Sequence, residues 1–321
     1  MKILIASGGT GGHIFPAIVF GKDRQKKGDI VSWLCGSRKL ESDIYHSAGI
    51  DPVILPLAGS PIGTKSPGKI LSRVIAMSKS FSMTAEYIRT FKPDEIYLFG
   101  GYISFAPLII ARLKKIPVTV HEQNAVAGRV TKIAAKIGAR IITGWPLCEG
   151  IKSFTYTGTP AREPMRISRG EALKILGVKV RESAKIIGVI GGSLGSKPLN
   201  KLLTQAAKLC ADYEFIFLSA KERYDDGNAH FLPAQWDMNP FYSACDMLVC
   251  RSGGSTLAEV MKWKIPAVTI PWPGAMDNHQ AKNAEEFVKL SGNACIFYEN
   301  DSPENLAEII RRLKNGISNS H

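Results

Sequence analysis

A histidine at the end of a glycine-rich segment is the residue best suited to acid–base chemistry. His13 closes the segment Gly8-Gly9-Thr10-Gly11-Gly12-His13, which follows a short apolar run and precedes a helical pattern. Glycines let the backbone turn tightly, and the N-terminus of the next helix offers N–H groups to an anion. Because histidine titrates near neutrality, His13 is a candidate general base beside a bound phosphate. The spacing equally allows a second role, in which His13 finishes the loop and hydrogen-bonds the phosphate.

Further turns with polar residues occur in the second half of the chain. The segment Gly191-Gly192-Ser193-Leu194-Gly195-Ser196 repeats the arrangement of apolar run, glycines and helix. A second segment, 251–256, opens a helix that carries Glu259, whose carboxylate suits the two hydroxyls of a ribose. Gln280 and Asn283 lie one helical turn apart, with amides suited to sugar hydroxyls. Neither a G-x-G-x-x-G fingerprint nor a P-loop is present, so the corresponding nucleotide-binding classes are not indicated.

Polar residues also end an apolar run in the first half, as His121-Glu122-Gln123-Asn124. Ligands of open α/β sheets bind at the carboxyl ends of the strands, so this segment is expected at a binding site. Glu122 is the reserve candidate for the base. Arg162, between the two halves, is either a ligand for a diphosphate or a surface charge of the linker.

Short β-branched runs alternate with longer amphipathic stretches along most of the chain. Strands are predicted over 3–6, 30–34, 52–55, 95–99, 118–121, 140–143, 186–190, 214–218, 247–250 and 267–270. Helices are predicted over 14–27, 85–91, 128–136, 198–209, 255–262 and 303–314. Most strands are apolar on both faces, which predicts an α/β protein with doubly wound parallel sheets.

A coarse internal repeat predicts two Rossmann-like domains. The segment KILIASGGTGGHIFPA at the start is echoed by IIGVIGGSLGSKPLN at 186–200, and IYLFGGYIS at 96–104 is echoed by LVCRSGGST at 248–256. A glycine- and proline-containing segment without periodicity, 157–165, marks the break between the halves. We therefore expect domains at residues 1–160 and 161–302, followed by a C-terminal helical segment, 303–321.

The 321 residues include 45% hydrophobic and 21% charged residues, an ordinary globular composition. The net charge of +13 indicates a polyanionic partner: nucleic acid, an acidic membrane surface or a phosphorylated substrate. Segment 61–92 mixes basic and apolar residues, as a membrane-surface patch does, although a core-facing helix with a solvated basic face has the same pattern. The predicted patch comprises Ile62, Lys65, Lys69, Ile70, Arg73, Val74, Met77 and Phe81. Aromatic residues are sparse there and no RNA-binding motif occurs, which disfavours nucleic acid.

The chain has neither a membrane-spanning stretch nor a signal peptide, and this predicts its location. No apolar stretch approaches the roughly 18 residues that span a bilayer. Residues 1–5 lead directly into the first glycine loop without the architecture of a signal peptide. These absences predict that the chain stays in the cytoplasm.

Six motifs, taken in chain order, resemble one family. They are GGTGGH at 8–13, GGY at 100–102, HEQN at 121–124, GGSLGS at 191–196, RSGGSTLAE at 251–259 and DNHQAKNA at 277–284. They look like the MurG-type peptidoglycan glycosyltransferases, which add N-acetylglucosamine to lipid I to make lipid II. The resemblance covers nearly the whole chain. It implies a GT-B fold, with two Rossmann-like domains facing across a cleft and the final helix returning toward the first domain.

The resemblance also implies roles for individual residues. For the donor, UDP-N-acetylglucosamine, Arg162 and Ser193 contact the diphosphate, Glu259 takes the ribose hydroxyls, and Gln280 and Asn283 contact the sugar. The remaining residues implied for the donor are Thr10, Gly11, Gly12, Asn124, Gln235, Gly254, Ser255, Thr256, Leu257 and Ala258. The acceptor pyrophosphate is expected against Gly9, Gly100, Gly101 and Tyr102. The chain departs from the family at Leu194, where glutamine is usual, and in the uracil-side segment at 234–236.

The implied reaction is an inverting transfer to the 4-hydroxyl of the N-acetylmuramoyl sugar of lipid I, with no cofactor and no obligatory metal. The implied partners are UDP-N-acetylglucosamine, lipid I, the anionic inner face of the membrane and other cell-wall synthesis proteins, with no nucleic acid. The implied location is peripheral, on the cytoplasmic face of the bacterial inner membrane. Two alternatives use the same fold: a glycolipid glycosyltransferase and a UDP-sugar epimerase. An epimerase has no lipid acceptor, so the basic apolar segment 61–92 speaks against it.

Overall fold

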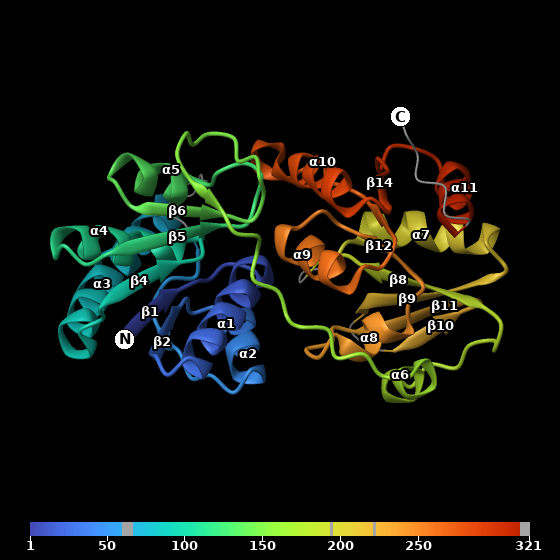
Figure 1. The fold of residues 1–321 in the computed structure, drawn as a ribbon, viewed down its shortest axis with the longest axis horizontal. Helices are drawn as coiled ribbons and strands as arrows, with labels where there is room; N and C mark the ends of the chain where they lie inside the picture. The colour runs from blue at the N-terminus through green and yellow to red at the C-terminus, as the bar shows by residue number, and fades with distance from the viewer. Residues whose placement is uncertain (60–66, 193–194, 221–222, 315–321) are drawn as a thin grey trace. The chain divides into compact units, whose positions relative to one another are not determined.

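The computed structural model describes residues 1–59, 67–192, 195–220 and 223–314. The chain divides into two compact units, Met1–Ala161 and Arg162–His321 (Figure 1). The division falls one residue after the boundary predicted from the sequence. All ten predicted strands coincide with observed strands, and each predicted helix lies at an observed helix.

Unit 1 is built on a seven-stranded parallel sheet of order β3-β2-β1-β4-β5-β6-β7. Its strands are β1 (Lys2–Ala6), β2 (Ile30–Cys35), β3 (Val53–Ile54), β4 (Glu95–Leu98), β5 (Val118–Glu122), β6 (Arg140–Thr143) and β7 (Thr155–Tyr156). Its helices are α1 (Gly11–Lys26), α2 (Lys39–Ser47), α3 (Pro67–Phe91), α4 (Phe105–Leu113) and α5 (Arg129–Lys136), with the 3₁₀ turn η1 (Tyr102–Ser104). The strand order reverses between β1 and β4, the point at which such sheets bind ligands.

Successive residues of β1 pack into opposite layers of unit 1. Ile3 and Ile5 belong to a core cluster with α1 and α2, whereas Leu4 and Ala6 belong to a second cluster with residues of α3, α4 and α5. Helices therefore cover both faces of the sheet (Figure 1). This double burial explains why the strands are apolar on both faces.

Unit 2 also has a seven-stranded sheet, of order β10-β11-β9-β8-β12-β13-β14. Its strands are β8 (Lys185–Ile190), β9 (Tyr213–Ala220), β10 (Tyr224–Asp226), β11 (Ala229–Pro233), β12 (Met247–Cys250), β13 (Ala267–Thr269) and β14 (Ala294–Ile296). Its helices are α6 (Arg169–Leu176), α7 (Lys197–Leu209), α8 (Asn239–Ala244), α9 (Gly254–Trp263), α10 (His279–Ser291) and α11 (Pro303–Lys314), with the 3₁₀ turn η2 (Met276–Asn278). The strand order reverses between β8 and β12.

One edge of the unit 2 sheet differs from the prediction of a wholly parallel sheet. Strand β10 pairs antiparallel with β11 across a turn at Gly227, whose φ is +63°. All three residues of β10 are exposed, so this strand has no apolar run from which it could be predicted.

The last described helix, α11, packs within unit 2. Leu306, Ala307 and Ile310 are buried in a core cluster that includes Leu199 and Leu203 of α7. The apolar face of α11 is thus used inside this unit, and residues 315–321 lie outside the described part of the chain. The expected return of segment 303–321 toward the first domain, and the expected cleft between the domains, stay predictions.

Candidate functional site

In unit 1, the loops that follow β1 and β4 meet at the point where the strand order reverses. A Cβ atom at Gly101, whose φ is +76°, would lie 2.5 Å from the carbonyl oxygen of Gly8. Gly9 has a φ of +96°, which residues with side chains rarely adopt. These glycines let the two loops touch, so Gly9, Gly100 and Gly101 lie at one place, as the sequence predicts.

His13 lies in the first turn of α1, and its ring faces both glycine loops. Its Nδ1 atom lies 3.1 Å from the carbonyl oxygen of Gly8, and a Cβ at Gly100 would come within 3.1 Å of the ring. In the neutral ring that donates Nδ1–H to Gly8, Nε2 is the unprotonated nitrogen. The loop geometry therefore presents Nε2 as the basic atom of His13.

Thr10 and the glycines around it begin α1. Thr10 is the N-cap residue, with an extended backbone and no side-chain capping bond, and Gly11 and Gly12 form the first turn. The N–H groups of a first helical turn have no partners within the helix, so the turn is suited to an anion.

Glu122 does not have the environment of a base, which corrects its role as the reserve candidate. Its Oε1 accepts hydrogen bonds from the backbone and side-chain nitrogens of Asn124, each at 3.1 Å. Its Oε2 accepts from Gly128 N at 2.9 Å and from the Thr131 hydroxyl at 2.6 Å. Four donors fill the acceptor capacity of a carboxylate. Glu122 therefore holds Asn124 and the start of α5 in place.

His121, next to Glu122, is also structural. It is buried, its ring stacks on Phe99 with centroids 5.3 Å apart, and its Nε2 lies 3.0 Å from the carbonyl oxygen of Gly158. Burial lowers the pKa of His121, so the ring is held neutral. Of the two histidines in the predicted motifs of unit 1, only His13 has the surroundings of a base.

Tyr102 lies beside the first glycine loop, and its contact with the acceptor stays a prediction. Its ring would be 3.8 Å from a Cβ at Gly9. Its hydroxyl donates to the buried carboxylate of Glu41, which also accepts from Gly36 N at 2.7 Å. Burial and this carboxylate raise the pKa of Tyr102. The ring, rather than the hydroxyl, is the part of Tyr102 that faces the loop.

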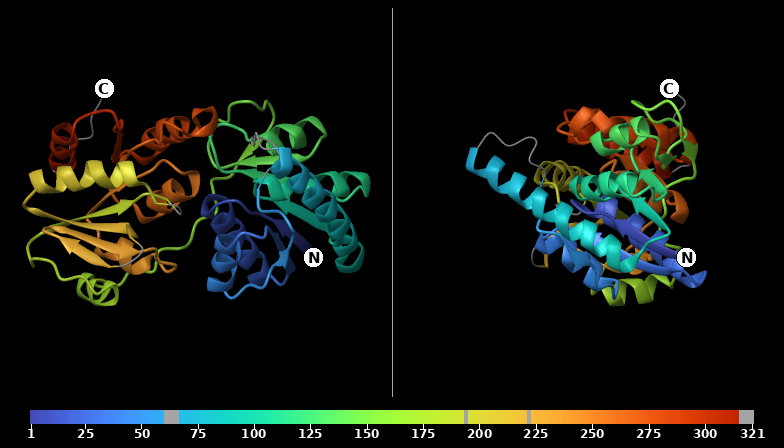
Figure 2. Two further views of the ribbon diagram at one scale, coloured as in Figure 1. Left: turned by 180° about the vertical axis from the view of Figure 1, so that it is seen from behind. Right: turned by 90° about the vertical axis from the view of Figure 1, so that its left-hand side faces the viewer.

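The basic apolar segment of the sequence corresponds largely to α3, a long helix that Figure 2 shows at the edge of unit 1. Ile70 and Val74 are exposed, as a membrane patch requires, and so are Leu71 and Ile75. The predicted patch residues Met77 and Phe81 instead pack against the core, because they lie on the inner face of α3. Ile62, Lys65 and the side chain of Lys69 lie outside the described residues.

The glycine loop after β8 opens α7 in unit 2. Gly192 and Gly195 have φ values of +86° and +68°, and a Cβ at Gly191 would lie 2.9 Å from Ser196 N. Ser196 caps α7 through a hydrogen bond from Leu199 N to its hydroxyl. The predicted diphosphate ligand Ser193, with Leu194, lies outside the described residues.

Arg251 joins the loops at this edge of unit 2, a role that sequence reasoning missed. The side chain is buried and its Nη2 donates to the Ser196 hydroxyl at 2.8 Å and to Glu299 at 2.9 Å. Its Nη1 donates to the carbonyl oxygens of Ile270 and Pro271. The signal in the sequence is a charged residue directly after the apolar run of β12.

Arg162 and Glu259 bind each other in this structure. Arg162 donates from Nε to Glu259 Oε1 at 2.8 Å and its Nη2 lies 2.8 Å from the same oxygen. The Tyr242 hydroxyl donates to Glu259 Oε2 at 2.8 Å. Arg162 also donates to the carbonyl oxygen of Trp236. The predicted contacts of Arg162 with a diphosphate and of Glu259 with a ribose stay predictions, and they require this ion pair to exchange partners.

The residues at the start of α9 differ in accessibility. Gly254, Ser255 and Thr256 form the first turn of α9, whereas the side chain of Leu257 is buried in the core and that of Ala258 is half-buried. Leu257 therefore has only its backbone to offer a ligand.

Asn283 is wholly buried and donates to the carbonyl oxygen of Ser252 at 2.9 Å, which corrects its predicted role in contacting a sugar. Gln280 is partly exposed and its Oε1 accepts from Trp272 N at 3.0 Å. Gln235 is half-buried and donates to the carbonyl oxygen of Pro233.

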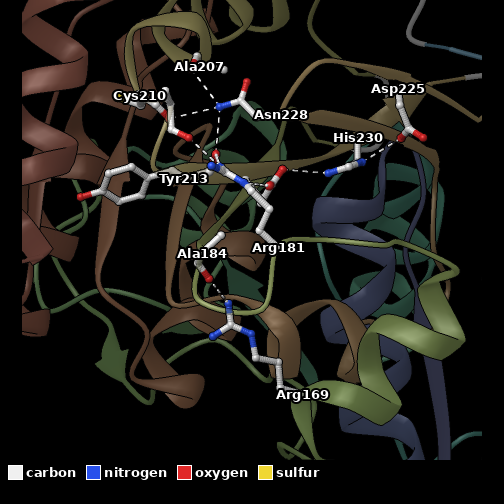
Figure 3. A network of polar contacts seen from close by, with 11 residues as sticks. Arg169, Arg181, Ala184, Ala207, Cys210, Tyr213, Asp225, Asn228 and His230 are labelled. Atoms are coloured by element: carbon white, nitrogen blue, oxygen red, sulfur yellow. Dashed lines mark hydrogen bonds and ion pairs between the residues drawn. The ribbon is translucent and has the colours of Figure 1, made fainter.

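A cavity of about 640 Å³ in unit 2 lies away from the glycine turns. Glu214, in its lining, pairs in register with Ile186 at the amino end of the sheet. Arg181 Nε donates to Glu214 Oε1 at 2.7 Å, and His230 Nε2 lies 3.1 Å from Glu214 Oε2. The other ring nitrogen of His230, Nδ1, lies 2.8 Å from Asp225 Oδ1 (Figure 3). These groups satisfy one another and attach β10 and β11 to β9. The network is therefore structural.

Comparisons with known proteins match both halves of the chain. The model of the glycosyltransferase family 28 N-terminal domain matches residues 3–143, and that of the family 28 C-terminal domain matches residues 186–320. Together they cover both sets of glycine turns.

Similar curated proteins carry one name, UDP-N-acetylglucosamine–N-acetylmuramyl-(pentapeptide) pyrophosphoryl-undecaprenol N-acetylglucosamine transferase. The protein from Pseudomonas fluorescens strain Pf-5 is 33% identical over 298 residues, 88% of this chain and 81% of the relative. The protein from Elusimicrobium minutum is 33% identical over 339 residues, covering 99% of this chain and 90% of the relative. The crystal structure of Acinetobacter baumannii MurG superposes with a TM-score of 0.70 at 27% identity, covering 98% of this chain and 90% of that one.

Proposed function

This chain belongs to glycosyltransferase family 28, and we propose that it transfers N-acetylglucosamine from UDP-N-acetylglucosamine to the 4-hydroxyl of the N-acetylmuramoyl sugar of lipid I. The product is lipid II, an intermediate of peptidoglycan synthesis. One observation carries the proposal: relatives with this transferase name are 33% identical to this chain over alignments that cover 88% and 99% of it. That finding also confirms the resemblance drawn from the six ordered motifs and does not favour a glycolipid transferase or an epimerase.

In the proposed reaction, His13 Nε2 takes the proton of the attacking 4-hydroxyl. The oxygen then forms a bond to the anomeric carbon of the donor sugar, and the bond from that carbon to the diphosphate oxygen breaks. UDP leaves with the electron pair on the opposite face, so the configuration inverts. Support comes from the position of His13 at a helix N-terminus, with Nδ1 held by Gly8. Glu122 contributes by holding Asn124 in the loop that follows β5.

We propose that unit 2 stabilises the leaving diphosphate without an obligatory metal. The first turn of α9 carries N–H groups that have no partner within the helix. In α7 only Lys197 offers such a group in the first turn, because Pro198 has no N–H and Ser196 caps Leu199. Arg162 supplies a positive charge beside α9, once Glu259 releases it and accepts hydrogen bonds from the ribose hydroxyls instead. Preorganised dipoles and a guanidinium of this kind stabilise developing negative charge.

The reaction is tested by transfer of labelled N-acetylglucosamine from UDP to a lipid I analogue, with and without EDTA. We expect labelled product in both conditions. Loss of product in EDTA would contradict the proposal that no metal is needed and would leave the proposed reaction unaffected. UDP-sugar binding without transfer to lipid I would contradict the proposed acceptor. The chain would then be another UDP-sugar enzyme of the same fold.

We also propose that the exposed apolar residues of α3 bind the anionic cytoplasmic face of the inner membrane. Within the part of the chain that the structure describes, no helix is long and apolar enough to cross a bilayer. Leu71 and Ile75 are 62% and 49% exposed on a helix that also carries Lys79 and Arg89. Exposed apolar side chains among basic ones are the combination that binds anionic membrane surfaces.

Replacing both Leu71 and Ile75 by serine is expected to weaken binding to anionic vesicles by about tenfold or more, because two apolar side chains no longer enter the interface. Cosedimentation with phosphatidylglycerol-containing vesicles measures the effect. The control is Leu113→Ser, which removes a 78% exposed apolar side chain from α4 instead. Equal binding by the double variant and the wild type would contradict the patch.

A further inference from the structure

Arg38 is fixed at the centre of the four loops that follow β1 to β4. Its Nε donates to the carbonyl oxygen of Ala58 at 2.8 Å, and its Nη1 donates to that of Gly9 at 3.1 Å. Its guanidinium carbon lies 5.5 Å from the centre of the Tyr102 ring. Ala58, Gly9 and Tyr102 follow β3, β1 and β4, and Arg38 itself follows β2. The guanidinium therefore joins all four loops at the carboxyl edge of the sheet.

The charge of Arg38 is not neutralised by these contacts. Arg38 is exposed and makes no ion pair with a carboxylate among the described residues. The nearby carboxylate of Glu41 is buried and bound by Gly36 N and the Tyr102 hydroxyl. Two carbonyl oxygens and an aromatic ring hold the guanidinium in place while leaving its full positive charge. Such a pre-positioned group is suited to the oxygens of a phosphate.

A second guanidinium approaches from α3. At Gly59, a Cβ would lie 3.4 Å from Nη2 of Arg73 and 3.7 Å from Nη2 of Arg38. The two arginines therefore converge on one loop residue, next to the glycine loop and the first turn of α1. This places Arg73 toward the loops, whereas the sequence pattern assigned it to the membrane patch.

We propose that Arg38, with Arg73 beside it, binds the diphosphate of the lipid acceptor against the Gly9 loop. Two guanidinium groups and a helix N-terminus provide for two adjacent phosphate groups, and the site lies where a doubly wound sheet binds its ligand. The identity of this diphosphate rests on the proposed function. An anionic membrane lipid is the other source of phosphate, and its headgroup would not need the glycine loop.

Direct binding tests the site without catalysis. The probe is geranyl diphosphate, titrated calorimetrically with UDP in excess so that the donor site is filled. We expect Arg38→Met to weaken binding at least tenfold, and Arg73→Met to weaken it as an independent second variant. Lys39→Met is the control, because it removes an equal charge from the neighbouring residue, which contacts Asp43. Unchanged affinity in Arg38→Met, with the fold verified by its melting curve, would overturn the inference.

Two further measurements distinguish the two sources of phosphate and separate this binding site from the proposed function. Arg38→Met is expected to raise the KM for a lipid I analogue at least tenfold and to leave the KM for UDP-N-acetylglucosamine and vesicle binding unchanged. Loss of vesicle binding with normal geranyl diphosphate affinity would assign Arg38 to a lipid headgroup and overturn the inference. If the wild type binds geranyl diphosphate through Arg38 yet transfers nothing to lipid I, the site stands and the proposed function fails.

Discussion

His13→Ala is expected to lower kcat by about 10²- to 10⁴-fold and to leave the affinity for UDP-N-acetylglucosamine unchanged. The reason is that Nε2 acts only when the acceptor hydroxyl loses its proton, whereas the main donor contacts are proposed in unit 2. We expect the backbone of the loop to survive the loss of the ring and of its hydrogen bond to Gly8, because Gly9, Gly100 and Gly101 set the shape of the loop. Steady-state kinetics with a lipid I analogue and calorimetric titration with UDP measure the two quantities.

Glu122→Gln is the matched comparison for His13→Ala. It removes the charge from a carboxylate that already accepts four hydrogen bonds. The expected result is a lower free energy of unfolding, by about 1.5–3 kcal/mol, since hydrogen bonds to a charged group are weakened. A loss of kcat as large as that of His13→Ala, without a loss of stability, would make Glu122 the base. A parallel loss of kcat and donor affinity in His13→Ala would show that His13 binds and does not catalyse.

Glu259→Gln is expected to raise the KM for UDP-N-acetylglucosamine by about ten- to a hundredfold. In the proposed complex, the carboxylate accepts hydrogen bonds from the two ribose hydroxyls, and hydrogen bonds to a charged group are worth about 1.5–3 kcal/mol. The amide keeps the shape of the side chain but has one acceptor oxygen in place of two. In addition, Arg162 loses the charge of its partner.

The control for Glu259→Gln is Glu163→Gln, which removes an exposed carboxylate that pairs with Lys262 in the same unit. We expect the donor KM of this control to remain within about twofold of the wild type, because surface ion pairs contribute about 0–1 kcal/mol. Initial rates at saturating acceptor provide both values. A normal donor KM in Glu259→Gln, accompanied by a lower melting temperature, would show that the pair with Arg162 only stabilises unit 2.

The strands and the glycine turns were predictable from local patterns. A strand that is covered on both faces has a continuous apolar run, and β1, with Ile3 and Ile5 on one face and Leu4 and Ala6 on the other, shows why. The glycines of the loops recur at positions of positive φ, such as Gly9, Gly101 and Gly192. The observed strands that were not predicted are β7, β10, β11 and β14. Strands β7 and β10 are short and exposed at the edges of their sheets, so they lack an apolar run.

The roles of polar side chains were less predictable, since they depend on hydrogen bonds and burial that arise only in the folded chain. Glu122 and Asn283 belong to the expected motifs, yet the first is saturated by Asn124, Gly128 and Thr131, and the second is buried against Ser252. Arg251 and Arg38 lie in the same kinds of loops and received no role from the sequence. Their contacts join residues about 20 to 55 positions apart.

The sequence by itself determined the two α/β halves, the position of each glycine turn at the end of a strand, and the family to which the ordered motifs point. These features depend on the spacing of residues along the chain, and so the sequence records them directly. Only the tertiary structure decided which side chains at those turns are engaged by the protein itself and which still face a ligand. Hydrogen-bond capacity and burial are properties of the folded neighbourhood, and for His13 and Arg38 that neighbourhood is assembled from several strands' loops at once.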